Sequence, residues 1–210
     1  MSVVEQVRAR FRSVDVRLLA TLATIAILLG LRTSDLNDPV GPEWLEYALI
    51  NLSALGSGVV VAVLAVAVAG FLLLDGRPRY ALLVIVCVVG TWIAMDLLKG
   101  SFGRERPTVV PHLVEEHGLS FPSGHSMTAA AVYLTLAELL ARTLQKRRLR
   151  IYTIAVAATI ALLVGFTRVF IGVHYPSDVL GGWAIGTSWA LLLGVITRSE
   201  RVKAAAPPGG

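Results

Sequence analysis

Six long apolar runs separated by short polar turns restrict the fold of this chain more than any other feature of its sequence. Hydrophobic residues make up 55% of the 210 residues and charged residues only 16%, which is too apolar for an ordinary soluble domain. Backbone groups inside a bilayer must hydrogen-bond within the protein, so apolar runs of roughly 20 residues form helices there. The sequence therefore predicts an all-α, polytopic membrane protein with six transmembrane helices, at residues 16–31, 59–74, 81–98, 124–141, 151–167 and 179–196.

The apolar run at residues 44–74 is too long for one crossing, since roughly 20 residues span the hydrocarbon. The break Gly56-Ser57-Gly58 divides it into a short interfacial helix and the second span. No small-x-small cleavage site follows the first run, which indicates a retained span and not a signal peptide. We expect a single six-span domain over residues 1–197 and a disordered cytoplasmic tail over residues 198–210.

Positive charge is distributed unevenly between the predicted turns. If both termini lie on the same side of the membrane, most of the 19 Lys and Arg residues lie on that side too. An excess of positive charge marks the cytoplasmic side. This predicts cytoplasmic N- and C-termini, and it accounts for the net charge of +5 as topology, with no nucleic-acid partner. The compact length and the preference for Arg over Lys indicate a prokaryotic inner (plasma) membrane. Basic residues that remain outside against this rule indicate a chemical role, and they are Arg32, Lys99, Arg104, Arg106 and Arg168.

The segment 168–178 places three chemically active side chains between two apolar runs. It contains Arg168, His174 and Asp178, and charge in a membrane chain indicates a functional site. The planar guanidinium of an arginine can bind an oxyanion through two parallel N–H groups, and an imidazole serves as nucleophile or base. A nearby carboxylate fixes the tautomer of the imidazole. This segment is therefore the predicted centre of the site.

The span count brings other polar residues to the same face of the membrane. No spanning run separates Lys99 from His125, and the interval from His125 to Arg168 is long enough for two crossings of roughly 20 residues each. The chain therefore returns to the same side, near the outer interface, where charge costs less than at the bilayer centre. The residues expected to converge are Lys99, Arg106, Ser123, His125, Arg168, His174 and Asp178.

Three short motifs among these residues resemble the signature of the type 2 phosphatidic acid phosphatase superfamily. The motifs are Lys99, six residues, Arg106-Pro107; Pro122-Ser123-Gly124-His125; and Arg168, five residues, His174, three residues, Asp178. One position departs, because Thr167 stands where the family usually has Ser, but threonine keeps a hydroxyl. The resemblance implies a membrane lipid phosphate phosphatase that shares its phosphate pocket with vanadium haloperoxidases and uses neither a metal nor another cofactor.

The residue types suit phosphate binding on their own terms. Phosphoryl transfer needs positioning and positive charge against the phosphate oxygens, and Lys99, Arg106 and Arg168 supply three cations. The start of the fourth span adds backbone N–H groups near Ser123 and Gly124 as an anion site. These five residues form the predicted phosphate-binding set.

Two histidines and an aspartate form the predicted catalytic set. His174 would attack phosphorus and become a phosphohistidine, with Asp178 orienting its ring. The resemblance implies that His125 protonates the leaving alkoxide and later activates water.

Other polar residues near the motifs are possible secondary members of the site. Arg104 would bind phosphate or a lipid headgroup, and the sequence favours neither. Asp96 lies one turn before Lys99 and would orient or simply pair with it. His112 and His117 lie in the polar connection and are expected to be solvated.

The substrate class follows from the resemblance, but the lipid does not. Phosphatidic acid, phosphatidylglycerol phosphate and a polyprenyl diphosphate all present a terminal phosphate, and each would enter laterally from the outer leaflet. The sequence leaves open the choice among them, the oligomeric state and any protein partner.

Three alternatives to a lipid phosphatase remain. A vanadate-dependent haloperoxidase-like enzyme is disfavoured by the six spans and by the absence of a large soluble body. A non-enzymatic membrane transporter or an inactive relative is disfavoured by the complete set of proposed catalytic residues. A metal hydrolase is the weakest, because the chain has neither His-Glu-x-x-His nor an acidic cluster, and its single Cys87 supports neither a disulfide nor a cysteine metal site.

Overall fold

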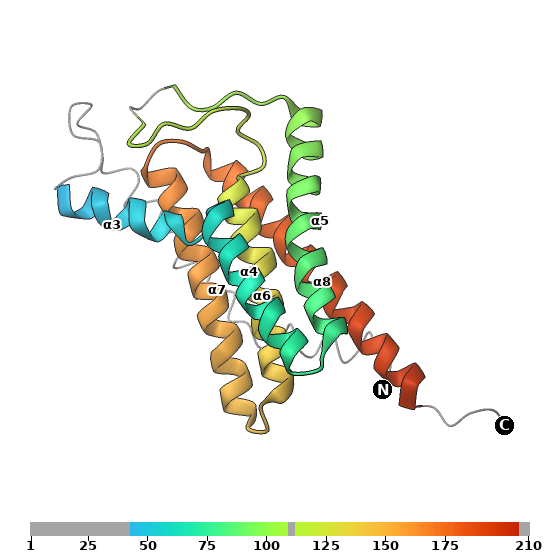
Figure 1. Ribbon diagram of the computed structural model, residues 1–210. Helices are drawn as coiled ribbons and strands as arrows, with labels where there is room; N and C mark the ends of the chain where they lie inside the picture. Colours follow the sequence, from blue (N-terminus) through green and yellow to red (C-terminus); the bar gives the residue numbers. More distant parts are fainter. Residues whose placement is uncertain (1–42, 109–111, 206–210) are drawn as a thin grey trace. The chain divides into compact units, whose positions relative to one another are not determined.

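The computed structural model describes residues 43–108 and 112–205 and contains only helices there, as predicted (Figure 1). The predicted first span, residues 16–31, lies outside the described residues. The helices are α3 Glu43–Ala54, α4 Gly58–Leu74, α5 Pro78–Phe102, α6 Gly124–Thr143, α7 Arg147–Phe170 and α8 Pro176–Ala205.

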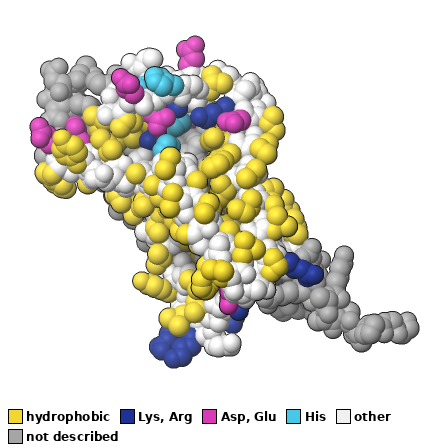
Figure 2. Space-filling model, viewed as in Figure 1, with side chains coloured by type: hydrophobic (Ala, Val, Ile, Leu, Met, Phe, Trp, Pro, Cys, Tyr) yellow, Lys and Arg dark blue, Asp and Glu magenta, His cyan; other side chains and the backbone are white. Residues whose placement is uncertain are grey.

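Three of these helices are long and apolar enough to cross a membrane. They are α5, α7 and residues Pro176–Thr197 of α8, and the bent pair α3 and α4 would make a fourth if it counts as one span. Large apolar side chains lie exposed along these helices, among them Leu82, Ile93, Ile151 and Val195. Figure 2 shows such side chains over the body of the bundle and charged side chains near its ends. An exposed apolar surface of this extent is typical of contact with lipid.

Helix α6, with 20 residues, is long enough for a span but less apolar than α5, α7 and α8, and it packs mainly against protein. It contacts α4, α5, α7 and α8, and small residues such as Ala129, Ala130 and Ala131 are fully buried on it. Gly182 of α8 lies so close that a side chain there would come within 2.7 Å of the Ser123 carbonyl oxygen. A helix enclosed by other helices needs small residues for close approach more than it needs apolar bulk.

The predicted division of the run 44–74 is confirmed. Helix α3 ends at Ala54 and α4 begins at Gly58, with a bend of 45° between them. Ser57 caps α4 by accepting a hydrogen bond from the Val60 N–H at 3.3 Å. A side chain at Gly56 would come within 2.8 Å of the His125 carbonyl oxygen. The bend therefore sits directly against the beginning of α6.

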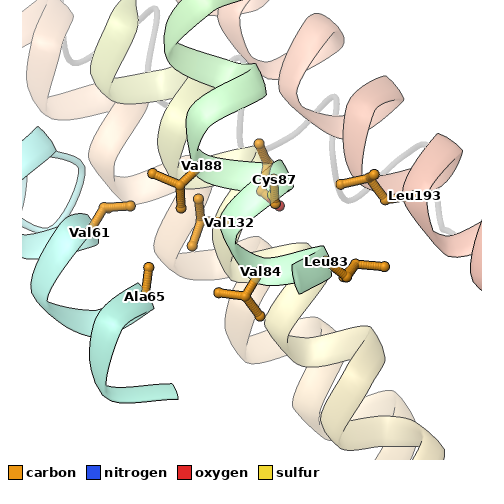
Figure 3. Packing of buried hydrophobic residues seen from close by; sticks show 9 residues of the cluster. Val61, Ala65, Leu83, Val84, Cys87, Val88, Val132 and Leu193 are labelled. Atoms are coloured by element: carbon orange, nitrogen blue, oxygen red, sulfur yellow. The ribbon is translucent and has the colours of Figure 1, made fainter. Parts of the chain in front are cut away.

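An apolar cluster fixes the arrangement of α4, α5, α6 and α8 away from the polar end (Figure 3). Val61, Val84, Cys87 and Val132 are each at most 1% exposed within it. The Trp189 indole N–H donates to the Cys87 carbonyl oxygen at 3.2 Å. Where helices face lipid instead of water, packing of this kind holds them together through van der Waals contact. The cluster therefore provides a rigid frame for the polar end of the bundle.

Helix ends differ from the predicted runs by a few residues. Helix α5 begins at Pro78 and ends before Gly103, whose φ of 59° is the left-handed conformation that favours glycine. Helix α8 continues to Ala205, past residue 197, where the disordered tail was expected to begin. The apolar pattern ends near the membrane boundary, but a helix continues beyond it when its backbone hydrogen bonds remain favourable. Residues 206–210 lie outside the described residues.

Candidate active site

The predicted site residues gather at one end of the bundle. The segment 103–123 joins α5 to α6, and the turn 171–175 joins α7 to α8 at the same end (Figure 1). Figure 2 shows a recess there in which basic, acidic and histidine side chains lie close together. Gly172 adopts a φ of 82° in the turn between α7 and α8, a conformation that glycine adopts without strain. The turn holds His174 between Arg168 at the end of α7 and Asp178 in the first turn of α8.

Asp178 is completely buried and is held by three donors. Its carboxylate accepts hydrogen bonds from the Ser120 hydroxyl at 2.5 Å, from Arg104 Nη1 at 2.8 Å and from the Tyr175 N–H at 2.9 Å. The Ser123 N–H also donates to the Asp178 carbonyl oxygen at 3.0 Å. A buried carboxylate needs such partners, so Asp178 is fixed in one orientation.

The imidazole of His174 lies between an arginine and the Ser120–Asp178 pair. Its Nε2 is 3.3 Å from Arg106 Nη1. Because a guanidinium can only donate, Nε2 must accept, and the proton of the neutral ring lies on Nδ1. Nδ1 is 3.3 Å from Ser120 Oγ and 3.5 Å from Asp178 Oδ2. The Ser120 hydroxyl therefore bridges the histidine and the carboxylate, a contact that the sequence did not predict, and Asp178 itself also lies close to Nδ1.

Burial and the surrounding cations keep His174 uncharged. Burial is the largest cause that lowers the pKa of His174, followed by the charges of Arg106, Arg168 and Lys99, and together they bring the pKa to about 2. The ring is thus neutral near pH 7, with a lone pair on Nε2 beside Arg106. This is the form that a nucleophilic histidine requires.

Two arginines form the positive wall of the site. Arg168 is 2% exposed, and its Nη1 donates to the hydroxyl of Ser53 on α3 at 2.8 Å. Arg106 donates to the carbonyl oxygens of Gly118 and Val173, each at 3.0 Å, and to that of His117 at 3.1 Å. The side chain of each arginine is therefore held in place by groups of the protein that carry no charge.

Glu116 is the principal site residue that the sequence analysis missed. Its carboxylate pairs with Arg168 through one oxygen and lies 3.4 Å from Arg106 Nη2 through the other. Burial opposes ionisation of Glu116, but the charge of Arg168 and its hydrogen bond, with smaller contributions from His125 and Arg106, outweigh it and lower the pKa. Spacing gives no signal for Glu116, because it lies in a connection without helical periodicity. The available signal was electrostatic, since two buried arginines require a counter-charge.

A cavity of about 190 Å³ lies next to these groups. Glu116, His125, Arg168 and Ser53 line it, together with apolar residues of α3 and Ile171. His125 belongs to the first turn of α6. His125, the predicted acid, therefore lines the same cavity as Arg168 and the end of α3.

The remaining predicted residues differ in how firmly they are held. Ser123 is buried at the N-cap of α6 and accepts a hydrogen bond from the Ser126 hydroxyl at 2.9 Å, and Gly124 begins the helix. Lys99 lies in the last turn of α5 and makes neither a hydrogen bond nor an ion pair with any described residue, Asp96 included. Asp96 nevertheless acts on Lys99 electrostatically through its charge, and its proposed role in orienting Lys99 stays a prediction.

Arg104 contacts residues around the turn between α7 and α8. It pairs with Asp178, donates to the Ser177 hydroxyl at 2.7 Å and stacks on the Tyr175 ring at 4.2 Å. Its binding of phosphate or a lipid headgroup stays a prediction. His112 is also engaged, because its Nε2 lies 2.7 Å from the Pro107 carbonyl oxygen. Both contacts organise the loops around the site. Among the described residues, no cluster of three or more His, Cys, Asp or Glu side chains could hold a metal ion.

Comparison with known proteins identifies similar chains. Residues 79–201 match the PAP2 superfamily. Phosphatidylglycerophosphatase B of Bacillus subtilis (strain 168) is 36% identical over 146 residues, covering 68% of this chain and 70% of the relative. A lipid A 1-phosphatase of Rhizobium johnstonii is 36% identical over 118 residues, which are 52% of this chain and 44% of that protein. The crystal structure of a transmembrane PAP2 type phosphatidylglycerolphosphate phosphatase from Bacillus subtilis aligns with a TM-score of 0.72 and 28% identity, covering 92% of each chain.

Proposed function

Since the chain belongs to the PAP2 superfamily, we propose that it removes the terminal phosphate of a membrane lipid phosphate or diphosphate, with His174 as the nucleophile. One observation carries this proposal: Nε2 of a neutral, buried His174 lies 3.3 Å from Arg106. A nucleophilic nitrogen beside a cation suits attack on a phosphate that the same cation holds.

In the first step, Nε2 of His174 attacks phosphorus while Arg106, Arg168 and Lys99 bind the non-bridging oxygens. The P–N bond forms as the bond from phosphorus to the lipid oxygen breaks. The negative charge of the bound phosphate favours the protonated form of His125, which donates its proton to that oxygen. The Nδ1 proton of His174 stays in place, held by Ser120, as positive charge develops on the ring.

In the second step, water replaces the histidine. His125, now neutral, accepts a proton from the water as its oxygen attacks phosphorus. The P–N bond breaks, the electron pair returns to Nε2 of His174 and inorganic phosphate leaves. His125 is then protonated again, so the cycle consumes only lipid phosphate and water.

Phosphatidylglycerol phosphate is the first candidate among the lipids. The Bacillus subtilis relative bears the name phosphatidylglycerophosphatase B, and the chain spans 70% of its length. Phosphatidic acid and a polyprenyl diphosphate present the same terminal group, and a relative from Sulfolobus acidocaldarius is named undecaprenyl-diphosphatase. These three lipids define the panel to be tested.

The chain would lie in the membrane with six spans, both termini cytoplasmic and the site at the outer face. The apolar surfaces of α5, α7 and α8 and the basic turn between α6 and α7, at the end opposite the site (Figure 1), support this orientation. A lipid would then reach the recess laterally from the outer leaflet. A reporter fused after Gly210 should be cytoplasmic, and a periplasmic reporter on an active enzyme would contradict the orientation.

A phosphate-release assay tests the function. The purified protein in detergent micelles should release phosphate from at least one lipid of the panel, and His174→Ala should reduce release to background. Ser101→Ala is a suitable control, because Ser101 is exposed on α5 and, among the described residues, its hydroxyl bonds only to the Leu97 carbonyl oxygen. Chelation of divalent metals should leave the rate unchanged. Release by His174→Ala at the wild-type rate would refute the role of His174.

A further inference from the structure

The Glu116 carboxylate occupies the position between the two arginines that the proposed mechanism gives to phosphate. One of its oxygens pairs with Arg168 and the other faces Arg106. Phosphate binds two guanidinium groups in the same bridging manner, with one oxygen for each. A carboxylate and a phosphate cannot both take these positions.

Both arginines have hydrogen-bond partners other than Glu116. Arg168 is anchored to Ser53 of α3, and Arg106 is anchored to three backbone carbonyl oxygens. Their side chains are 3% and 8% exposed, whereas that of Glu116 is 24% exposed. Removal of the carboxylate would therefore leave the two cations in position.

The surroundings also provide room for an exchange. Glu116 lies in the segment 103–123, and the described residues of this segment, 103–108 and 112–123, form no helix. The cavity of about 190 Å³ is adjacent to it, and Arg168 Nε is buried without a hydrogen-bond partner in the described residues. A ligand with several acceptor oxygens would satisfy this nitrogen, which Glu116 leaves unbound.

We propose that Glu116 is an internal competitor for the phosphate site, which substrate phosphate must displace from Arg106 and Arg168. This inference rests on the proposed phosphate-binding role of those arginines. In the resting protein the carboxylate offsets part of the buried positive charge, which would otherwise be costly.

Competition of this kind makes Glu116 a determinant of specificity. A phosphomonoester carries close to two negative charges near pH 7, because its second pKa is about 6. A phosphodiester lipid carries one charge, the same as the carboxylate. The carboxylate therefore keeps phosphodiester headgroups of the surrounding bilayer out of the site and yields to the more highly charged terminal phosphate.

The test compares Glu116→Gln with Glu105→Gln. The first substitution keeps the size of the side chain and removes its charge. The second removes the same charge from an exposed residue of the same segment that makes no ion pair with the described residues. Inorganic phosphate is the probe, measured as a competitive inhibitor of aryl phosphate hydrolysis in detergent micelles and by calorimetric binding.

Glu116→Gln should bind inorganic phosphate about tenfold more tightly than wild type, since the removed competitor carries a full charge. Glu105→Gln should remain within about twofold of wild type. Phosphatidylglycerol, a phosphodiester, should inhibit Glu116→Gln more strongly than wild type. Unchanged or weaker phosphate binding by a folded Glu116→Gln would overturn the inference and make Glu116 a positioning residue for the arginines.

A second variant keeps the test decisive if Glu116→Gln does not fold. Glu116→Asp retains the charge but is one methylene shorter and cannot bridge both arginines, so its phosphate affinity should also rise, by a smaller factor. A lower affinity would contradict the competition. Failure of wild type and all variants to bind phosphate would instead refute the proposed phosphate site itself.

Discussion

Two segments supply the proposed nucleophile and most of its partners, and they differ in regularity. The segment 168–178 consists of the end of α7, a tight turn and the first turn of α8, whereas the segment 103–123 is largely irregular. They are nevertheless joined by several contacts: Arg104 and Ser120 bind Asp178, Arg106 contacts His174, and Glu116 pairs with Arg168. The regular segment places the nucleophile, and the irregular segment sets its protonation, its orientation and the charge around it.

Among conservative substitutions, the largest expected effect on the regular side comes from Arg168→Lys. Lysine keeps one charge but loses the planar fork and the bond that spans to Ser53. We expect kcat/KM for phosphate release to fall by roughly 10²-fold, comparable to the loss of one donor to a developing oxyanion. The midpoint temperature of thermal unfolding should change little, which would show that the variant loses catalysis and not folding.

The matching change on the irregular side is Arg104→Lys. Arg104 contacts Asp178 and Ser177 instead of the Arg106–Arg168 wall, so its replacement should reduce kcat/KM less than Arg168→Lys does. Equal losses in the two variants would contradict this separation of roles.

Ser120→Ala probes the bridge between the two segments. Loss of the hydroxyl leaves Nδ1 of His174 without its nearer partner and removes one donor from the buried Asp178. We expect kcat to fall by about tenfold, the size of one hydrogen bond to a charged group, with little change in KM. Ser101→Ala is the control, and a loss confined to KM would show that Ser120 acts on binding and not on the nucleophile.

The pH dependence of stability tests the neutral state of His174 and should give the smallest effect. The pKa of His174 falls from 6.5 to about 2 on folding, so below pH 6.5 the unfolded chain binds a proton that the folded chain does not. The free energy of unfolding should therefore decrease as pH falls, by up to about 1.4 kcal/mol per unit.

The comparison is between wild type and His174→Gln, from about pH 6.5 down to about pH 5. This window lies above the ordinary pKa of 4.5 of glutamate, so titration of Glu116 contributes little. Wild type should lose more stability than the variant. An equal loss in both proteins would mean that His174 is charged when folded.

The sequence predicted what depends on periodicity and fixed spacing. The apolar runs located five of the described helices, with ends within about four residues except the C-terminal end of α8 at Ala205, and the short helix before the bend at Gly56. Charge between the runs singled out Arg168, His174 and Asp178, because spacing along helices and short turns carries over directly into space.

Loop contacts could not be predicted in this way. Glu116, Ser120 and the pairing of Arg104 with Asp178 depend on the path of residues 103–123, for which the sequence has no periodicity. Ser53 was missed for a related reason, because its contact with Arg168 depends on how α3 folds back at a bend. Hydropathy also cannot establish the number of spans. Helix α6 is enclosed by protein, so it lacks the hydropathy of a lipid-facing helix.

The central claim is that His174 attacks phosphorus and His125 supplies the proton, and rapid quench of His125→Ala tests it most directly. An aryl phosphate needs little protonation of its leaving group, so it should still phosphorylate His174 in this variant. Hydrolysis of the phosphohistidine needs water activated by His125, so it should be slow.

The expected result is a burst of aryl product together with an acid-labile phosphoenzyme, whereas an alkyl lipid phosphate should give neither. His174→Ala should give no phosphoenzyme with either substrate. A phosphoenzyme that persists in His174→Ala, or that forms equally well from both substrates in His125→Ala, would contradict the assignment of the two histidines.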